Sequence, residues 1–296
     1  MSILRDNINM GAKELRKQLN SKKIIIAPGV SNGLSAIIAE RAGFKTLYMS
    51  GSGVAGTRGL PDLSVISLDE VAYDARNIIA VSRSPLIVDV DTGFGEPLNV
   101  IRTVRMMESL GAAAIHMEDQ VLPKKCGHLN GKAVVGADAM IQKIYSAVKA
   151  RKDKNFVIIA RTDARAVEGL DAAIERSNLY AGAGADAIFT EALESESEFK
   201  ECVKKIHAPL LANMTEFGRS PLISAKDLES IGYKIVIFPL TAFRGSALAS
   251  KKVYEELARS GTQKNIINSI MTRGDFYSAI GYDEYEKEDD ETSRFA

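Results

Sequence analysis

Short apolar segments recur along the chain, each separated from the next by a longer stretch with helical periodicity. The segments are rich in Ile, Val, Leu and Ala and alternate little between polar and apolar positions. That pattern is typical of parallel strands buried on both faces. The predicted strands are 24–27, 46–49, 86–90, 113–117, 156–160, 187–190, 210–212 and 235–238.

Amphipathic stretches between these segments predict helices. Four of them are followed by a glycine, Gly43, Gly111, Gly184 or Gly232, where a glycine commonly ends a helix. The alternation of strands and helices predicts an α/β protein, a (β/α)8 TIM barrel. The predicted helices are 33–42, 68–81, 97–110, 137–151, 169–183, 195–205 and 224–231.

An open, doubly wound sheet is the alternative architecture. It requires a glycine-rich dinucleotide loop after an early strand and an acidic residue at a later strand end. The segment Gly51-Ser52-Gly53 lacks the third glycine at the required spacing. The pattern therefore favours the barrel.

The two ends of the chain add helices to this repeat. Residues 9–19 predict a short amphipathic helix before the first strand. After the last strand, three stretches are helical by pattern: 243–260, 263–272 and 275–280. Because one of these suffices as the eighth barrel helix, the extension from about 261 to 296 must pack elsewhere, on this barrel or on a neighbour. The acidic tail 283–296 favours a solvated or frayed end. Residues 1–296 are thus predicted to form one barrel domain with this extension.

Composition narrows the class of protein. The chain has 296 residues, 46% of them hydrophobic, and 38 basic residues balance 38 acidic ones. This balance gives no reason to expect nucleic acid or an anionic membrane as a partner. No apolar run reaches the roughly 18 residues of a membrane span. Cys126 and Cys202 lack metal-ligand spacing and the amino terminus lacks a signal-peptide core, so we expect a reduced, cytoplasmic protein.

Polar or small residues follow seven of the predicted strands. In a barrel the carboxyl ends of the strands meet at one face, which carries the active site. These residues are therefore predicted to surround a single site. They are Ser50, Gly51, Ser52, Gly53, Asp89, Asp91, His116, Glu118, Arg161, Thr162, Asp163, Glu191, Asn213, Met214, Thr215 and Arg244.

Asp89 and Asp91 are two residues apart on one strand, so both carboxylates face the same side. Two inward carboxylates without a partner are costly to ionise, and a divalent cation resolves this cost. Oxygen ligands with room for water favour Mg²⁺, or else Mn²⁺. Glu118 can join through water, and Asp62 can reach the metal-bound waters. The alternative is that arginines such as Arg161 hold the pair.

Several groups suit a ligand with carboxylates. The segment 50–53 exposes backbone N–H groups after a strand, and such a turn either cradles an anion or is a simple connection. His116 is expected to support the site from beneath. Guanidinium forks, which suit carboxylates, come from Arg161, Arg244 and Arg273. Together with a metal, these groups predict a small substrate with several carboxylates.

A cysteine stands in a segment crowded with cations. Cys126 follows Lys124 and Lys125 and precedes Gly127 and His128. Positive charge stabilises a thiolate, so we expect a lowered pKa for Cys126 and a thiol that exchanges a proton near neutrality. The alternative is a small core residue, which these charged neighbours do not favour.

The run Glu118-Asp119-Gln120 followed by Lys124-Lys125-Cys126-Gly127-His128 resembles the signature of the isocitrate lyase and phosphoenolpyruvate mutase superfamily, in its lyase branch. The similarity extends from about 24 to 285. The resemblance implies a barrel whose last helix is swapped between subunits of a homotetramer, a dimer of dimers. It also implies Mg²⁺ near Asp89 and Asp91.

The resemblance further implies cleavage of 2-methylisocitrate to pyruvate and succinate, in propionate catabolism through the methylcitrate cycle. In this retro-aldol reaction Tyr48 or a metal-associated carboxylate such as Glu118 takes the hydroxyl proton, and Cys126 protonates the departing carbon. The implied substrate contacts are Ser50, Gly51, Ser52, Cys126, Gly127, Arg161, Glu191, Asn213, Thr215, Arg244 and Arg273.

Two positions depart from the pattern of the family. Ser52 stands where a third consecutive glycine is common, and Thr190 stands where proline is common before the glutamate. Phe189 resembles the residue that makes space for the substrate methyl group. The rival functions are a lyase or decarboxylase for 2,3-dimethylmalate, isocitrate or oxaloacetate, and a barrel that binds dicarboxylates without catalysis. Binding alone needs no thiol, so the cysteine motif argues against the last.

Overall fold

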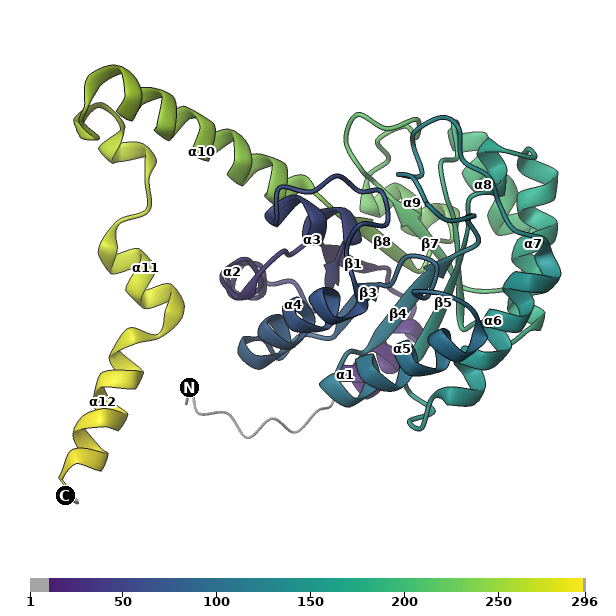
Figure 1. Cartoon of the computed structure of the whole chain (residues 1–296), viewed down its shortest axis with the longest axis horizontal. Helices are drawn as coiled ribbons and strands as arrows, with labels where there is room; N and C mark the ends of the chain where they lie inside the picture. The colour runs from purple at the N-terminus through teal and green to yellow at the C-terminus, as the bar shows by residue number, and fades with distance from the viewer. Residues whose placement is uncertain (1–10, 295–296) are drawn as a thin grey trace.

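Within residues 11–294, which the computed structural model describes, eight parallel strands alternate with helices (Figure 1). The sheet order is β1-β8-β7-β6-β5-β4-β3-β2, and a bridge between Gly29 and Tyr48 joins β1 to β2, so the sheet closes into the predicted barrel. The strands are β1 (Ile25–Pro28), β2 (Leu47–Met49), β3 (Leu86–Asp89), β4 (Ala114–Glu118), β5 (Val157–Thr162), β6 (Ala187–Thr190), β7 (Leu210–Asn213) and β8 (Ile235–Phe238).

Several helices begin at a side chain that caps the backbone. Asn32 accepts a hydrogen bond from the Ser35 N–H, and Ser67 accepts one from the Glu70 N–H, each within a capping box. The helices are α1 (Gly11–Leu19), α2 (Gly33–Arg41), α3 (Gly51–Thr57), α4 (Leu68–Val81), α5 (Pro97–Leu110), α6 (Ala137–Ala150), α7 (Leu170–Gly182), α8 (Glu196–Lys205), α9 (Ala225–Ile231), α10 (Thr241–Ser260), α11 (Arg273–Ile280) and α12 (Tyr282–Ser293), with 3-10 turns η1 (Ala164–Ala166) and η2 (Lys264–Ser269).

Side chains on each strand alternate between two apolar clusters. One fills the barrel interior with small and branched residues, and Leu15 and Leu19 of α1 close its amino-terminal end. The other, larger cluster lies between the strands and the surrounding helices. On β3, β4 and β5 these apolar residues are followed by Asp89, Glu118 and Arg161 at the carboxyl ends of the strands.

The structure differs from the sequence prediction mainly near the ends of the chain. Residues 9 and 10 of the predicted first helix lie outside the described residues, and α3 was not predicted. Residues 263–272 contain the short 3-10 turn η2 instead of a helix. The tail predicted to be solvated or frayed is solvated but helical: α12 buries no residue, and its Lys287 and Glu291 pair one turn apart at 3.7 Å.

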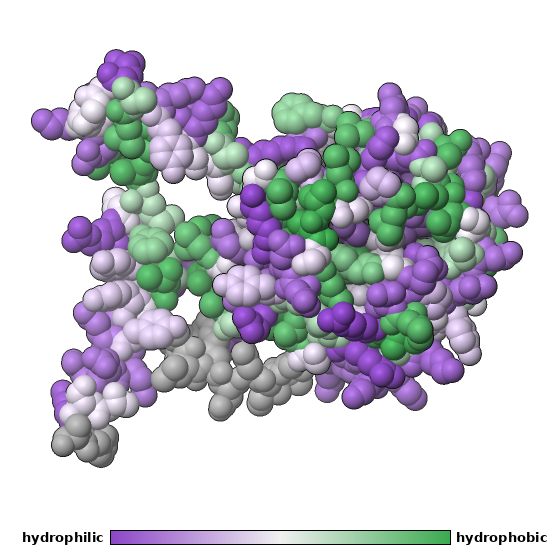
Figure 2. Space-filling model, viewed as in Figure 1, coloured by the Kyte–Doolittle hydropathy of each residue, from purple (hydrophilic) through white to green (hydrophobic). Residues whose placement is uncertain are grey.

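Residues 241–293, called the arm below, leave the barrel and extend beside it (Figure 1). Within the described part of the chain, α10 and α12 bury no residue, and α11 buries Ala279. Apolar side chains therefore lie exposed along the arm (Figure 2): Leu248, Tyr254, Leu257, Ile267, Ile270, Met271, Phe276 and Tyr285. No helix among residues 11–294 is long and apolar enough to cross a membrane.

Candidate active site

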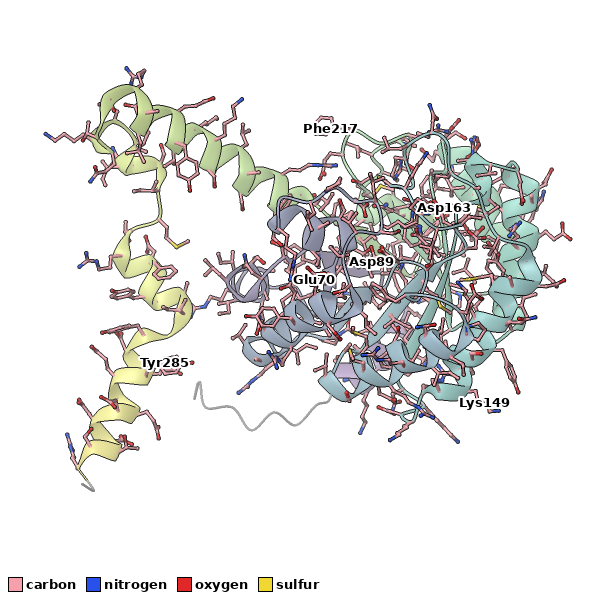
Figure 3. All side chains as sticks on the ribbon, in the orientation of Figure 1. Glu70, Asp89, Lys149, Asp163, Phe217 and Tyr285 are labelled. Carbon is pink, nitrogen blue, oxygen red and sulfur yellow. The ribbon has the colours of Figure 1, made fainter. Side chains whose placement is uncertain are left out.

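The barrel interior changes from apolar to charged towards the carboxyl ends of the strands. The last inward positions of β3, β4 and β5 are Asp89, Glu118 and Arg161. Strand register sets Asp89 beside His116 and Glu118 beside Arg161. All four side chains are buried. Figure 3 shows Asp89 inside the barrel and Lys149 at the opposite end.

Asp89 and Asp91 both lie against the first residue of α3. The Gly51 N–H donates to Asp89 Oδ2 at 3.0 Å, and the Asp91 N–H donates to Asp89 Oδ1 at 3.1 Å. A Cβ on Gly51 would lie 3.1 Å from Asp91 Oδ1 and 3.2 Å from Asp89 Oδ2. Asp91 has a φ of 48°, a left-handed conformation that is uncommon for a residue with a side chain. The two carboxylates thus lie together, and a side chain at position 51 would have to displace them slightly.

The environment separates the pKa values of these two carboxyls. Burial by itself raises the pKa of Asp89, but the His116 ring, the Lys124 ammonium and the Arg161 guanidinium together lower it to about 2. Burial raises the pKa of Asp91 to about 6, with Lys124 opposing the rise and Asp89 adding to it. The pair therefore holds one firm negative charge and one that titrates near neutrality.

Lys124 supplies the cation at this pair. Its ammonium lies 2.8 Å from Asp91 Oδ1 and also contacts Asp62 Oδ1. The alternative interpretation of the sequence, in which Arg161 holds the two aspartates, is therefore wrong. Burial opposes the charge on Lys124, but the surrounding carboxylates raise its pKa well above the ordinary value.

Within residues 11–294, no group of three or more His, Cys, Asp or Glu side chains is arranged to hold a metal ion. A cation at Asp89 and Asp91 would have to complete its shell with water and ligand oxygens. Mg²⁺ is commonly bound in this way, through one or two carboxylates, whereas a structural zinc site supplies four protein ligands. The donor set therefore fits Mg²⁺.

Arg161 is enclosed by three carboxylates. Its Nε and Nη2 donate to Asp163 at 2.9 and 3.1 Å, Nη1 lies 3.0 Å from Glu118 Oε2, and Nη2 lies 3.6 Å from Glu191 Oε1. The guanidinium also lies 5.1 Å from the centroid of the Phe189 ring. Burial disfavours the cation, but the carboxylates raise its pKa well above the usual value. Arg161 is therefore a fixed positive charge suited to a carboxylate ligand.

Tyr48 and His116 form a buried pair beside Asp89. Tyr48 Oη lies 2.6 Å from His116 Nε2, which lies 3.5 Å from Asp89 Oδ1. Burial, and then Asp89, raise the pKa of Tyr48 well above its ordinary value. A tyrosinate is therefore disfavoured, which argues against Tyr48 as the base. Burial also raises the pKa of Glu118 and lowers that of His116, whose contacts with Tyr48 and Asp89 support the site.

The Cys126 thiol is not surrounded by cations in the way that its sequence neighbours suggest. The Lys124 ammonium turns to the aspartate pair, and Lys125 Nζ donates at 2.9 Å to a backbone carbonyl of its own loop. Burial raises the pKa of Cys126; a hydrogen bond from the His128 N–H opposes this and Glu191 adds to it. The predicted lowering of the pKa is therefore wrong. A thiol that keeps its proton at neutral pH is suited to donate one.

The cysteine loop packs against Glu191 through Gly127 and His128. A Cβ on Gly127 would lie 2.3 Å from Glu191 Oε1 and 2.5 Å from Arg161 Nη2, so a side chain at 127 cannot be accommodated without a shift. His128 Nε2 lies 3.3 Å from Glu191 Oε1. On the far side, Asn213 Nδ2 donates to Glu191 Oε1 and Oε2 at 3.3 and 3.2 Å. The thiol, the carboxylate and the amide thus gather around Arg161.

The segment 50–53 is the start of a helix. Ser50 is the N-cap of α3, and Gly51 and Ser52 lie in its first turn. The N–H groups expected from a loop therefore belong to a helix amino terminus, which favours an anion.

Thr215 and Arg244 lie at the edge of the site near β7 and α10. Arg244 Nη1 donates to Glu216 Oε2 at 2.7 Å and to Thr215 Oγ1 at 3.4 Å. Its guanidinium lies 5.7 Å from the centroid of the exposed Phe217 ring, which Figure 3 shows at the rim. Arg273 begins α11 on the arm and is exposed. The structure does not bring Arg273 to the site of its own chain.

Sequence reasoning did not assign to the site three residues with buried side chains, which are Lys132, Asp119 and Tyr180. Lys132 Nζ lies 3.2 Å from Asp163 Oδ1. Asp119 accepts hydrogen bonds from Thr162 Oγ1 at 2.8 Å, from the Asp163 N–H at 2.9 Å and from Tyr180 Oη at 2.8 Å. The one available signal was Asp119 itself, which stands in the Glu-Asp-Gln run.

Phe189 and Thr190 point to opposite sides of β6. Phe189 belongs to the barrel interior, where its ring centroid lies 5.6 Å from that of His116. Thr190 Oγ1 lies 3.5 Å from Ser177 Oγ on α7. The departure from the family pattern at position 190 therefore faces the helices and not the site.

Comparison with known proteins gives one consistent family. The model of the phosphoenolpyruvate phosphomutase family matches residues 15–258. A relative from Aeropyrum pernix named 2-methylisocitrate lyase is 53% identical and covers 95% of this chain and 91% of its own. A solved 2,3-dimethylmalate lyase covers 95% of both chains with a TM-score of 0.90 and 38% identity. A phosphonopyruvate hydrolase in complex with oxalate and Mg²⁺ covers 94% of this chain and 97% of its own, with a TM-score of 0.86 and 30% identity. This chain therefore belongs to the phosphoenolpyruvate mutase and isocitrate lyase superfamily.

Proposed function

We propose that this protein is a Mg²⁺-dependent carbon–carbon lyase that cleaves 2-methylisocitrate to pyruvate and succinate. The observation that carries the proposal is the closed cysteine loop, which sets a protonated thiol beside Arg161 and Glu191 at the mouth of the barrel. The Aeropyrum pernix relative named for this reaction supports the choice of substrate.

Asp89 and Asp91 are the residues proposed to hold Mg²⁺. Their carboxylates lie together and, within residues 11–294, no third acidic, His or Cys ligand joins them, which leaves room for water and substrate oxygens. When bound, Mg²⁺ supplies a Lewis acid that lowers the pKa of the substrate hydroxyl. The phosphonopyruvate hydrolase solved with oxalate and Mg²⁺ supports this combination of cation and dicarboxylate in the family.

The remaining polar groups are proposed to bind the substrate carboxylates. Arg161 and the backbone at residues 50–52, at the start of α3, are assigned to these carboxylates. Further contacts are assigned to Gly127, Glu191, Asn213, Thr215 and Arg244. Phe189 is proposed to line the space for the substrate methyl group, because its ring faces the interior beside Arg161.

The reaction is a retro-aldol cleavage with two proton transfers. We assign the hydroxyl proton to a carboxylate associated with the metal site, because burial raises the pKa of Tyr48 well above its ordinary value and disfavours its phenolate. The electron pair of the breaking bond moves onto the carbon that becomes succinate, and its carboxylate takes up charge near Arg161 and Asn213. Cys126 then donates its proton to that carbon.

The arm is proposed to pack on a neighbouring barrel, in a homotetramer built as a dimer of dimers. Its apolar side chains are exposed, and Ile26 on β1 is 37% exposed at the place that an eighth barrel helix would cover. If neighbouring subunits exchange arms in this way, Arg273 of one subunit can reach the site of the other. Light scattering after gel filtration should give a tetramer mass; a monomer would contradict the exchange.

The reaction places the protein in propionate catabolism, through the methylcitrate cycle. Cys126 and Cys202 are free thiols, and a working thiol acid fits a reducing cytoplasm.

The deciding experiment measures pyruvate release with 2-methylisocitrate and Mg²⁺, coupled to lactate dehydrogenase, with and without EDTA. We expect rapid release that EDTA abolishes. The same assay with 2,3-dimethylmalate and oxaloacetate, and a glyoxylate assay with isocitrate, tests the rival lyases and the decarboxylase. If one of these substrates is turned over faster than 2-methylisocitrate, it is the substrate of the enzyme. If none is turned over, the result favours a protein that only binds dicarboxylates.

A further inference from the structure

We propose that Lys132 is a positioning residue that holds the Cys126 loop in its closed, donor-ready arrangement by joining the Gly127 carbonyl to Asp163. The inference rests on the proposed role of Cys126 as proton donor and adds a residue to it. Lys132 lies six residues beyond the cysteine, in a part of the loop with no recognisable motif.

The first observation is the position of the Lys132 ammonium. Its side chain is 1% exposed, and the ammonium lies 3.2 Å from Asp163 Oδ1, whose own side chain is fully buried. The ammonium also contacts the backbone carbonyl oxygen of Gly127. A buried lysine is costly unless its charge is paired, and here the pair joins the loop to the end of β5.

The second observation is the geometry of the Gly127–His128 peptide. Because a trans peptide is planar, its C=O and N–H point in opposite directions. The C=O accepts from Lys132, so the His128 N–H lies on the side of the peptide away from the ammonium. Lys132 therefore fixes the orientation of the peptide one residue beyond Cys126, at the point where Gly127 lies against Glu191 and Arg161.

The third observation is that Asp163 also orients the guanidinium. It accepts from Arg161 Nε at 2.9 Å and from Nη2 at 3.1 Å, while it faces Lys132. Lys132 thus links the cysteine loop, through the Gly127 carbonyl, to the same carboxylate that orients the substrate-binding arginine. Loss of the ammonium would also leave Asp163 with one cation in place of two.

The test compares Lys132→Met with the wild-type protein in two measurements. The first is the rate of Cys126 alkylation by iodoacetamide, read at the high-pH plateau where the rate reports access to the thiolate. We expect a rise of about tenfold, the factor that one charge-assisted hydrogen bond contributes to a closing equilibrium. The second is turnover, where kcat should fall by about 100-fold with a smaller change in KM, since misplacement of a catalytic group by about 1 Å has this effect.

Matched variants separate positioning from a loss of folding. Lys125→Met removes an ammonium of the same loop that bonds Gly131 and not the site, and its plateau rate should stay within about twofold of wild type. Asp163→Asn should raise the plateau rate of alkylation as Lys132→Met does. The variant with both substitutions should show the same rate as either single variant. Cys202 is buried, and its contribution is subtracted with a Cys126→Ala variant.

A plateau rate and a kcat within about twofold of wild type in a folded Lys132→Met protein would overturn the proposal. If that variant does not fold, Lys132→Gln, which keeps a donor on a shorter side chain, is judged by the same criteria. The alkylation measurement needs no substrate, so it tests Lys132 even if 2-methylisocitrate is not turned over. Failure of the wild-type protein to release pyruvate would instead count against the proposed function.

Discussion

The carboxyl-terminal rim of the barrel buries charged side chains that pair with one another, whereas the arm exposes apolar side chains that contact little of their own chain. At the rim, Arg161 lies within 3.6 Å of three carboxylates, one of which, Asp163, also pairs with Lys132, and Lys124 pairs with Asp91. On the arm, Tyr254 is 70% exposed and Leu248 is 54% exposed. The rim thus pairs its buried charged side chains with one another within one chain, while the arm leaves apolar area that a second chain can bury.

This difference predicts where a substitution acts. A change at the rim should alter chemistry or stability and leave assembly intact. A change on the arm should alter assembly, or the site of a neighbouring subunit, and leave the fold of its own barrel intact.

The largest effect is expected at the thiol. Cys126→Ser should fold and assemble as wild type but lose about 10²- to 10⁴-fold in kcat, the range that a positioned proton donor contributes. Steady-state pyruvate release gives the rate, and circular dichroism with gel filtration gives the control. Near-normal turnover would remove Cys126 from the mechanism.

The second effect concerns the arm. Arg273→Ala should lower kcat/KM by about 10- to 100-fold, as expected for the loss of one charged hydrogen bond to a carboxylate. Arg259→Ala, on an exposed arm residue that pairs with Glu256 of its own helix, is the matched control and should have little effect.

Mixing subunits shows whether Arg273 acts on a neighbour. An Arg273→Ala chain keeps Cys126, and a Cys126→Ser chain keeps Arg273, so exchange of arms in a mixed oligomer rebuilds some intact sites. Turnover of the refolded mixture should then exceed that of either parent. A mixture no more active than its parents would place Arg273 outside the site or within its own chain.

The third effect is on stability. Asp119→Asn replaces an acceptor of four hydrogen bonds by an amide that cannot accept them all, and should lower the free energy of unfolding by about 2 to 3 kcal/mol. Urea unfolding at fixed protein concentration measures the loss. Asp171→Asn, at a carboxylate that is 93% exposed, should change it by less than about 0.5 kcal/mol. If the two variants lose the same free energy of unfolding, the buried Asp119 carboxylate contributes no more to stability than an exposed one.

The smallest effect is the response to pH. Since burial raises the pKa of Cys126 above its ordinary value of 9.0, the protonated thiol is the main species from pH 7 to 9, and the midpoint of its titration should lie above pH 9. The thiolate absorbance at 240 nm, compared with that of Cys126→Ala, follows this titration. A titration midpoint below pH 8 would instead support the lowered pKa of Cys126 that the sequence predicted.

The sequence by itself determined the barrel and most of its rim. Eight apolar segments with polar ends require parallel strands whose carboxyl ends meet, and this brings Asp89, Glu118, Arg161 and Glu191 together whatever the details of packing. The side-chain period of two then fixes which of these residues point inward.

Tertiary structure decided how those charges are paired, because pairing depends on directions in space and not on distance along the chain. Lys124 and Lys125 directly precede the cysteine in sequence, yet the ammonium of Lys124 contacts Asp91 and that of Lys125 contacts Gly131. Burial therefore raises the pKa of the thiol. Lys132 has no motif, yet folding of the loop sets it on Asp163. The sequence supplied the helices of the arm, but only the folded chain shows that they leave the barrel with their apolar side chains exposed.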